Sequence, residues 1–175
     1  MIKKILIGLV VIIAVFMGYV ALQPAEYTIS REISINASAD KIFPHVNNSK
    51  LMNDWNPWMK FDPTAKVTFS GPDAGVGTKT SWEGGEKLGT GSATVYESVT
   101  NSRVKTKLEY SEPFVMSQDA EISLTPAENQ TIVRWSVSGK NNLIGRAMCI
   151  FMNMDKMVGG TFEEGLKNLK ATLES

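Results

Sequence analysis

The side chains that could do chemistry are few, and they do not form a catalytic set. His45 is the only histidine and Cys149 the only cysteine among 175 residues. One cysteine cannot form an internal disulfide or a cysteine-based zinc site, and one histidine cannot supply a multi-histidine metal site. We interpret His45, beside Pro44, as a structural residue, and we predict that Cys149, in the apolar run 147–152, is buried packing material. We expect no metal and no cofactor.

Carboxylates offer a second route to catalysis. Asp54, Asp62, Glu83 and Glu109 could point toward the mouth of a pocket, where a buried acid could act as a base on a polyketide or steroid-like substrate. Their sequence surroundings single out none of them, so we interpret them as solvated surface charges. The glycine-rich segment 84–91 lacks the Gly-Lys-Ser/Thr ending of a phosphate loop and joins two predicted strands, which favours a hairpin turn.

Aromatic and methionine side chains are more suggestive of a binding site. Aromatic residues recur in the predicted strands and their connecting loops, and methionines gather at the start of the predicted C-terminal helix. Methionine adapts to variable apolar partners, although plain core packing is the competing interpretation. The residues that we predict to line a cavity are Trp55, Trp58, Trp82, Tyr96, Leu108, Tyr110, Phe114, Trp135, Met148, Met152 and Phe162.

The overall composition excludes one broad class of partner. Lys plus Arg equals Asp plus Glu at 18 each, so the net charge is zero, and the sequence has no basic run beyond Lys3-Lys4. A nucleic-acid binder normally carries a basic surplus or patch, so we expect no nucleic-acid partner. Hydrophobic residues make up 43% and charged residues 21%, which is typical of a globular domain.

The N-terminal region contains an uncharged stretch over residues 5–22. Eighteen residues of helix span roughly 27 Å, close to the hydrocarbon thickness of a bilayer. Lys3 and Lys4 precede the stretch, so the positive-inside rule places the N-terminus in the cytoplasm and the rest on the periplasmic or extracellular side. A cleaved signal peptide is the main alternative, although residues 20–23 form a poor cleavage site; a buried core helix is the other.

The remaining chain predicts a mixed α+β domain. Pro24 ends the first helix, and alternating residues from Tyr27 to Ile35 predict a half-buried strand. A short helix should follow, with Ser38 or Asp40 as its N-cap, and a second short helix is expected over residues 49–55. Further strands, separated by turn residues, are predicted over residues 66–70, 77–83, 89–99, 103–110, 116–124 and 131–138.

The C-terminal segment changes to helical periodicity. Phe162, Leu166, Leu169 and Leu173 share one helix face, and the helix extends back to about residue 143, with a weak point at 159–160. Short loops between consecutive strands favour an antiparallel meander. A curved sheet of about seven strands around a long C-terminal helix would bury every apolar stripe and leave a cavity between the two.

This pattern resembles the START-like, or SRPBCC, superfamily over residues 26–174. The resemblance rests on alternation from Tyr27 to Ile35 followed by residues 39–43, and on these further motifs: Trp55-Asn56-Pro57-Trp58 with Asp62-Pro63, Gly75-Val76-Gly77-Thr78 with Trp82, Gly89 with Gly91, and Gly160, Phe162, Gly165, Leu166, Leu169 and Lys170. The superfamily includes polyketide cyclases/dehydrases, lipid-transfer proteins and the birch-pollen allergen family. The resemblance implies a helix-grip fold with a hydrophobic ligand pocket.

These observations predict a membrane anchor over residues 1–25 and a START-like domain over residues 26–175. The leading hypothesis is membrane-tethered binding of a lipid or another hydrophobic small molecule between sheet and C-terminal helix. The alternatives are a cyclase or dehydratase that uses a pocket carboxylate, and a regulatory interaction domain. The sequence leaves the ligand and the oligomeric state open.

Overall fold

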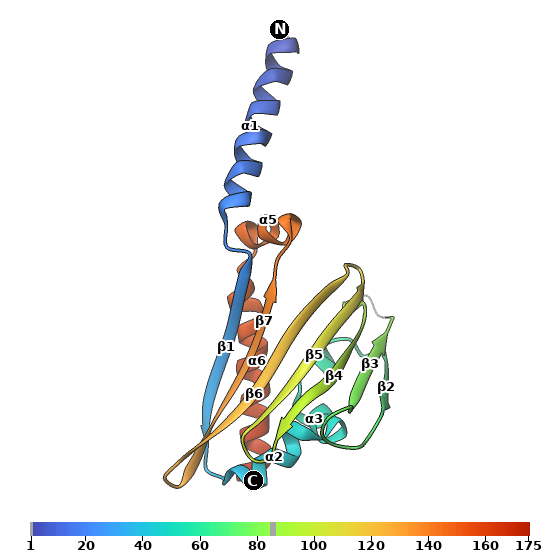
Figure 1. The fold of residues 1–175 in the computed structure, drawn as a ribbon, viewed down its shortest axis with the longest axis vertical. Coiled ribbons are helices and arrows are strands. Elements are labelled where there is room, and N and C mark those ends of the chain that lie inside the picture. The colour runs from blue at the N-terminus through green and yellow to red at the C-terminus, as the bar shows by residue number, and fades with distance from the viewer. Residues whose placement is uncertain (1, 85–86) are drawn as a thin grey trace.

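The N-terminal helix projects from the rest of the molecule. The structure, a computed structural model, describes residues 2–84 and 87–175. Helix α1 (Ile2–Leu22) stands apart from the domain in Figure 1, and Val20 is its one buried residue. Its 21 residues span about 32 Å. The helix is therefore long and apolar enough to cross a membrane, as a signal sequence also can be.

The rest of the chain builds one antiparallel sheet with a long helix on its concave face (Figure 1). The sheet has seven strands in the order β1-β7-β6-β5-β4-β3-β2, so β2 to β7 form a meander and β1 pairs with the last strand. This architecture confirms the predicted helix-grip fold. The strands are β1 (Glu26–Ile35), β2 (Lys66–Ser70), β3 (Lys79–Glu83), β4 (Thr90–Val99), β5 (Arg103–Glu112), β6 (Met116–Ala127) and β7 (Gln130–Lys140).

Short helices connect the first two strands. They are α2 (Ala39–Asn47), α3 (Ser49–Trp55) and α4 (Trp58–Phe61), of which the sequence predicted the first two. Ser38 is the N-cap residue of α2, and the Asn48 side chain caps α3 by accepting hydrogen bonds from the backbone N–H groups of Lys50 and Leu51.

The C-terminal helical region breaks at Met152 and Asn153, not at Gly159-Gly160 as predicted. Helix α5 (Leu143–Phe151) ends at Met152, whose backbone is extended, and α6 (Met154–Glu174) then begins. The Asn153 side chain caps α6 by accepting a hydrogen bond of 2.9 Å from the N–H of Lys156. Because the cap starts a new helix, α5 can turn across the end of the domain (Figure 1).

The tightest packing lies at the end of the domain away from α1. There α6 and α2 cover the sheet, and the side chains that are less than 2% exposed include Trp55, Ile35, Ile42, Val133, Leu166 and Leu169. The Trp135 ring stacks on Phe162 with centroids 4.3 Å apart and meets Trp55 edge-on at 5.3 Å. Gly165 permits this approach, because a Cβ there would lie 2.7 Å from the Trp135 ring. We call the end that contains Ile35, Ile42, Val133, Leu166 and Leu169 the closed end.

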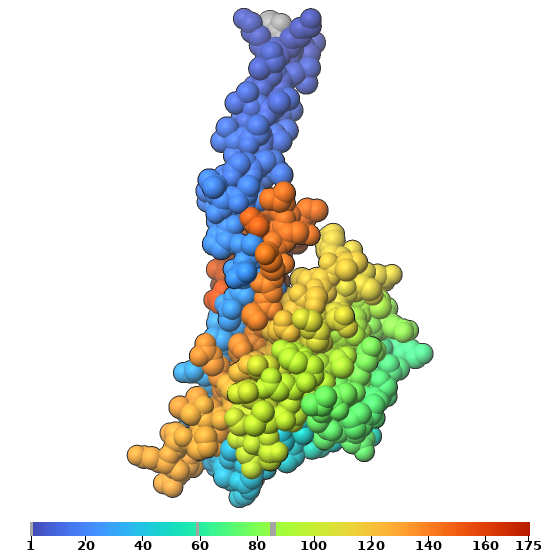
Figure 2. Space-filling view, viewed as in Figure 1, coloured from blue at the N-terminus to red at the C-terminus, as the bar shows by residue number. Residues whose placement is uncertain are grey.

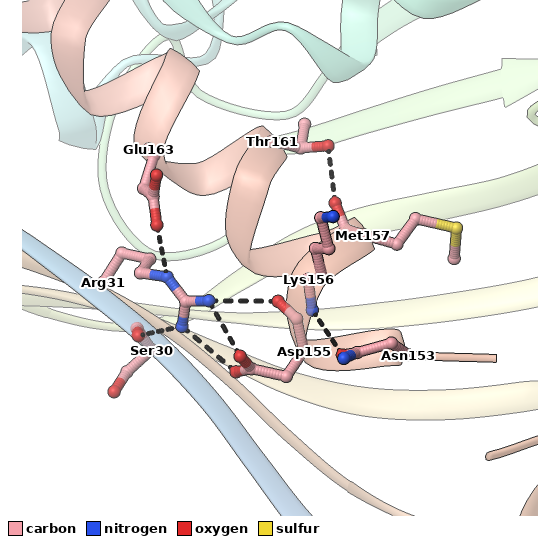
Figure 3. Close-up of polar contacts among 8 residues, drawn as sticks. All are labelled: Ser30, Arg31, Asn153, Asp155, Lys156, Met157, Thr161 and Glu163. Atoms are coloured by element: carbon pink, nitrogen blue, oxygen red, sulfur yellow. Dashed lines mark hydrogen bonds and ion pairs between the residues drawn. The ribbon is translucent and has the colours of Figure 1, made fainter. Parts of the chain in front are cut away.

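Arg31 holds the first half of α6 against β1 (Figure 3). Its guanidinium forms ion pairs of 2.9 Å with Asp155 and 2.7 Å with Glu163, and it donates to the backbone oxygens of Ser30 and Asp155. A Cβ at Gly159 would collide with the guanidinium. The glycine therefore lets α6 pass over Arg31 closely enough for both ion pairs to form.

Candidate functional site

An inner cavity of about 120 Å³ lies between the sheet and helices α3, α4 and α6. The strands contribute alternate residues, so β5 presents Val104, Thr106, Leu108 and Tyr110 to the same space. The described residues that line it are Val46, Ser49, Met52, Asn53, Asn56, Trp58, Thr80, Trp82, Leu88, Ala93, Val104, Thr106, Leu108, Tyr110, Ala120, Ile122, Trp135 and Phe162.

Small side chains at the centre of the sheet create this space. Ala93 on β4 pairs with Leu108, and Ala120 on β6 pairs with Thr106, so two alanines flank the inward row of β5. Both alanines line the inner cavity. A larger residue at either position would fill volume that the fold leaves empty.

A larger outer cavity of about 800 Å³ adjoins the inner one at the end of the domain nearest α1. Among the described residues, four side chains line both cavities: Trp58, Leu108, Tyr110 and Phe162. The outer lining also includes Tyr27, Thr28, Ile29, Met116, Gln118, Val137, Asn141, Cys149, Ile150, Phe151, Met152, Asn153, Met154, Asp155, Met157 and Val158. We call this region, with α5 and the β5–β6 hairpin, the open end.

The polar groups of the cavities are mainly neutral hydrogen-bonding groups. Burial raises the pKa of Tyr110 to about 12, and burial also raises the pKa of Tyr27, whose hydroxyl pairs with the Gln118 side chain. The Trp82 Nε1–H is buried and has no hydrogen-bond partner among the described residues. A buried donor without a partner costs free energy that a bound acceptor could recover.

The candidate carboxylates do not supply a buried base. Asp54, Glu83 and Glu109 are exposed, whereas Asp62 is 4% exposed, so the surface interpretation is wrong for Asp62. The Asp62 carboxylate accepts hydrogen bonds from the Thr64 hydroxyl at 2.6 Å and from the Lys87 N–H at 2.9 Å. These bonds stabilise the charged form and hold the pKa of Asp62 at about 2. Asp62 therefore joins two loops.

Among the described lining residues, Asp155 is the one carboxylate. It lies in the outer cavity, where its ion pair with Arg31 lowers its pKa. A carboxylate that is held ionised by a guanidinium is a weak proton acceptor. Its position fits the attachment of α6 better than proton transfer.

The single histidine and cysteine have different surroundings. His45 is half-buried on α2, and its backbone oxygen accepts a hydrogen bond of 3.0 Å from Trp55 Nε1, which fits the structural interpretation. Cys149 is exposed, so the prediction of burial is wrong. The reason is that α5 turns away from the sheet and carries no buried residue.

The glycine-rich segment 84–91 lies between two paired strands. Residues 85 and 86 lie outside the described residues. Strands β3 and β4 on either side are antiparallel, with Trp82 opposite Gly91. This pairing fits a connection between neighbouring strands and not the start of a helix.

The predicted cavity residues fall into three groups. Six of them line the inner cavity: Trp58, Trp82, Leu108, Tyr110, Trp135 and Phe162. Met152 lines the outer cavity alone. The remaining predicted residues, Trp55, Tyr96, Phe114 and Met148, line neither cavity.

The local structure explains why these four residues line neither cavity. Trp55 is 1% exposed within the core. Tyr96 lies at a register irregularity of β4 and is exposed, because its neighbour Val95 points inward. Phe114 lies at the tip of the β5–β6 hairpin, and Met148 lies on α5; both are exposed.

Sequence reasoning missed Met52, Asn53 and Asn56 as lining residues. They belong to α3 and its C-cap. A seven-residue helix is too short to reveal its inward face by periodicity.

The fold and its cavities define a helix-grip protein with an apolar interior. Residues 26–174 match the family described as polyketide cyclase / dehydrase and lipid transport, and the chain belongs to that family. A comparison with curated proteins finds no match.

Solved structures share the fold at low sequence identity. The Aha1 dimer from Colwellia psychrerythraea is similar at TM-score 0.59 and 19% identity, over 85% of this chain and 96% of that one. Protein CV1439 from Chromobacterium violaceum is similar at TM-score 0.59 and 16% identity, over 85% and 97%. Protein jhp0584 from Helicobacter pylori is similar at TM-score 0.61 and 12% identity, over 84% and 88%. These likenesses show the fold alone.

Proposed function

We propose that this protein is a membrane-tethered binding protein that holds a lipid or another hydrophobic small molecule between its sheet and α6. The observation that carries the proposal is the pair of adjoining cavities lined mainly by apolar side chains. Ligand pockets typically measure about 300–1,000 Å³ and combine an apolar lining with a few placed polar groups. The family includes lipid transport in its description, which agrees with this function.

The lining suggests how a ligand would be oriented. No charged residue lines the inner cavity among the described residues, so this space suits an uncharged part of the ligand. The donors at Trp82 and Tyr110 suit a neutral acceptor such as a carbonyl or ether oxygen. A charged head group would then remain in the outer cavity or outside it.

The cyclase or dehydratase alternative needs a cavity acid with a raised pKa. Asp155, the lining carboxylate among the described residues, has a lowered pKa. Binding without chemistry is therefore the function that the geometry supports best.

The anchor in this proposal is α1, with Lys3 and Lys4 on the cytoplasmic side and the domain on the periplasmic or extracellular side. Tethering keeps the cavity beside the bilayer and raises its effective concentration near lipid. Carbonate extraction of membranes that contain the full chain tests the anchor. The chain should stay in the pellet, and protease added outside intact cells or spheroplasts should cut the domain. If carbonate releases the chain from the membranes, α1 is not a membrane anchor and this part of the proposal is refuted.

Native mass spectrometry with lipid extraction, together with titration of a dansyl-labelled undecanoic acid, tests binding by the full chain in detergent. Ala120→Leu should weaken binding of the probe by about tenfold or more, because the new side chain occupies the inner cavity. The matched variant Ala171→Leu, on the exposed face of α6, should bind like the wild type. A wild-type chain that carries no lipid and does not bind the probe would refute the proposal.

A further inference from the structure

Helix α5 leaves its apolar side chains uncovered. It has no buried residue, although most of its sequence is hydrophobic. The exposed large hydrophobic residues from α5 to the first turn of α6 are Leu143, Ile144, Met148, Ile150, Phe151, Met152 and Met157, of which the last four also line the outer cavity. A contiguous apolar surface on a soluble domain normally marks an interaction site.

The structure attaches α5 directly to the end of α1. Phe151 meets Phe16 of α1 with ring centroids 6.0 Å apart. The Arg146 guanidinium donates hydrogen bonds to the backbone oxygens of Ala21 at 3.0 Å and Gln23 at 3.3 Å. These acceptors lie at the C-terminus of α1, where helix carbonyls lack partners of their own. The contacts place α5 beside the C-terminal end of α1 (Figure 1).

The β5–β6 hairpin brings a second apolar group to the same end of the molecule. Its tip lies at the end of the domain where α1 emerges, opposite the C-terminus (Figure 1). Phe114 is 63% and Val115 88% exposed there. Figure 2 shows a notch between this tip and α5. The outer cavity lies between these two elements, because Met116 of β6 and Met152 after α5 both line it.

We propose that α5 and the tip of the β5–β6 hairpin form a rim that inserts into the bilayer surface, so that the outer cavity opens onto lipid. This inference rests on the proposed function, in which α1 spans the membrane. Helix α5 of the rim contacts the C-terminal part of α1. If α1 spans the membrane, the rim therefore lies at the membrane–water interface. Amphipathic helices in that plane bury their apolar side chains among the acyl chains. A hydrophobic ligand then passes between bilayer and cavity without crossing water.

The side chains around the rim suit a lipid partner more than a protein partner. Tyr19 is exposed near the C-terminal end of α1, and tyrosine is enriched at membrane interfaces. Lys140 and Lys156, on either side of α5 in the sequence, are exposed and can meet lipid phosphates. Because the tether already confines the rim to the membrane surface, lipid is the partner that it meets at the highest concentration.

Site-specific quenching tests the position of the rim. Cys149 is the only cysteine, so Cys149→Ser gives a background for single-cysteine variants. A nitrobenzoxadiazole label is attached at Ile144→Cys, at Val115→Cys or at the control Ser175→Cys, and the full chain is reconstituted in phosphatidylcholine–phosphatidylglycerol vesicles. Nitroxide-labelled lipids should quench the first two labels strongly and the third only weakly. Equal quenching at all three positions would refute the rim.

A transfer assay tests what the rim does. Ile144→Asp with Val115→Asp should slow transfer of the dansyl-labelled undecanoic acid from donor vesicles to the full chain in acceptor vesicles by about tenfold or more. Binding of the probe in detergent should not change, since neither residue lines a cavity. The control Val99→Asp, also exposed but at the β4–β5 turn, should transfer at the wild-type rate.

The outcomes separate the two proposals. If the chain stays embedded and binds the probe while the double variant transfers it at the wild-type rate, the rim proposal fails and the proposed function stands. Release of the wild-type chain by carbonate, or absence of probe binding in detergent, would instead count against the proposed function. A dimer formed through α5 would also refute the rim proposal. It would be detected as a doubled mass together with loss of lipid quenching at the Ile144→Cys label.

Discussion

The closed and open ends of the domain are built from the same sheet and the same helix, yet they pack differently. At the closed end, Leu166 and Leu169 of α6 are at most 1% exposed against Ile35, Ile42 and Val133. At the open end, α5 contributes no buried residue, and a cavity of about 800 Å³ separates the helices from the sheet. The difference teaches that the fold packs its core tightly at one end and leaves unfilled space between helix and sheet at the other.

Arg31 lies between these two regions. Its ion pairs with Asp155, which lines the outer cavity, and with Glu163 connect the first half of α6 to β1. On the N-terminal side of Asp155, the helical chain is interrupted at Met152, where α5 ends. Ion pairs between β1 and α6 therefore take the place of apolar packing beside the outer cavity.

The largest expected effect is the loss of a core leucine. Leu169→Ala should lower the free energy of unfolding by about 2–5 kcal/mol, because it removes a fully buried side chain and leaves a void. The same substitution at Leu143, exposed on α5, should change it by less than about 0.5 kcal/mol. Denaturant unfolding of the full chain in detergent, followed by tryptophan fluorescence, measures both. Similar losses at the two positions would contradict the difference in packing between the two ends.

Two adjacent glycines of α6 sharpen the comparison. Gly159→Ala should destabilise the domain by up to about 1 kcal/mol, because the new methyl group displaces the Arg31 guanidinium from its exposed ion pairs with Asp155 and Glu163. Gly160→Ala meets no atom within 4 Å and should stabilise the helix by up to about 1 kcal/mol, since alanine has the higher helix propensity. The same unfolding assay compares them. A stabilising Gly159→Ala would show that Arg31 does not hold α6 closely.

The smallest expected effect is a pH dependence at Asp62, whose carboxylate joins two loops. Its pKa is about 2, below the ordinary value of 3.8, so the ionised carboxylate stabilises the fold above pH 3.8 and loses this effect as the pH falls toward 2. Asp62→Asn should therefore be less stable than the wild type at neutral pH, with a difference that shrinks between pH 4 and 2. Exposed Asp54→Asn is the control and should show no such convergence.

Much of the fold could be predicted because periodicity reports which side of an element is buried. The alternation of Val133, Trp135 and Val137 predicted a strand with one inward face, and these residues are buried on β7. The helical spacing of Phe162, Leu166 and Leu169 likewise predicted the face of α6 that meets the sheet.

The candidate site was only partly predictable. Residues in regular strands, such as Leu108 and Tyr110, were assigned correctly to the inward row. Tyr96 was not, because a register irregularity in β4 interrupts the simple alternation. Residue type also misled the interpretation of Asp62, whose burial depends on hydrogen bonds from backbone groups of a distant loop.

The sequence by itself determined the elements, their order and the apolar face of each, because these properties depend on neighbours within a few residues along the chain. Only the tertiary structure decided where space remains between those faces and which way α5 turns. Empty volume depends on how side chains from different strands and helices meet, as Ala93 and Ala120 do on either side of β5. The direction of α5 depends on a cap at Asn153 and on contacts with α1, which is more than 120 residues away in sequence.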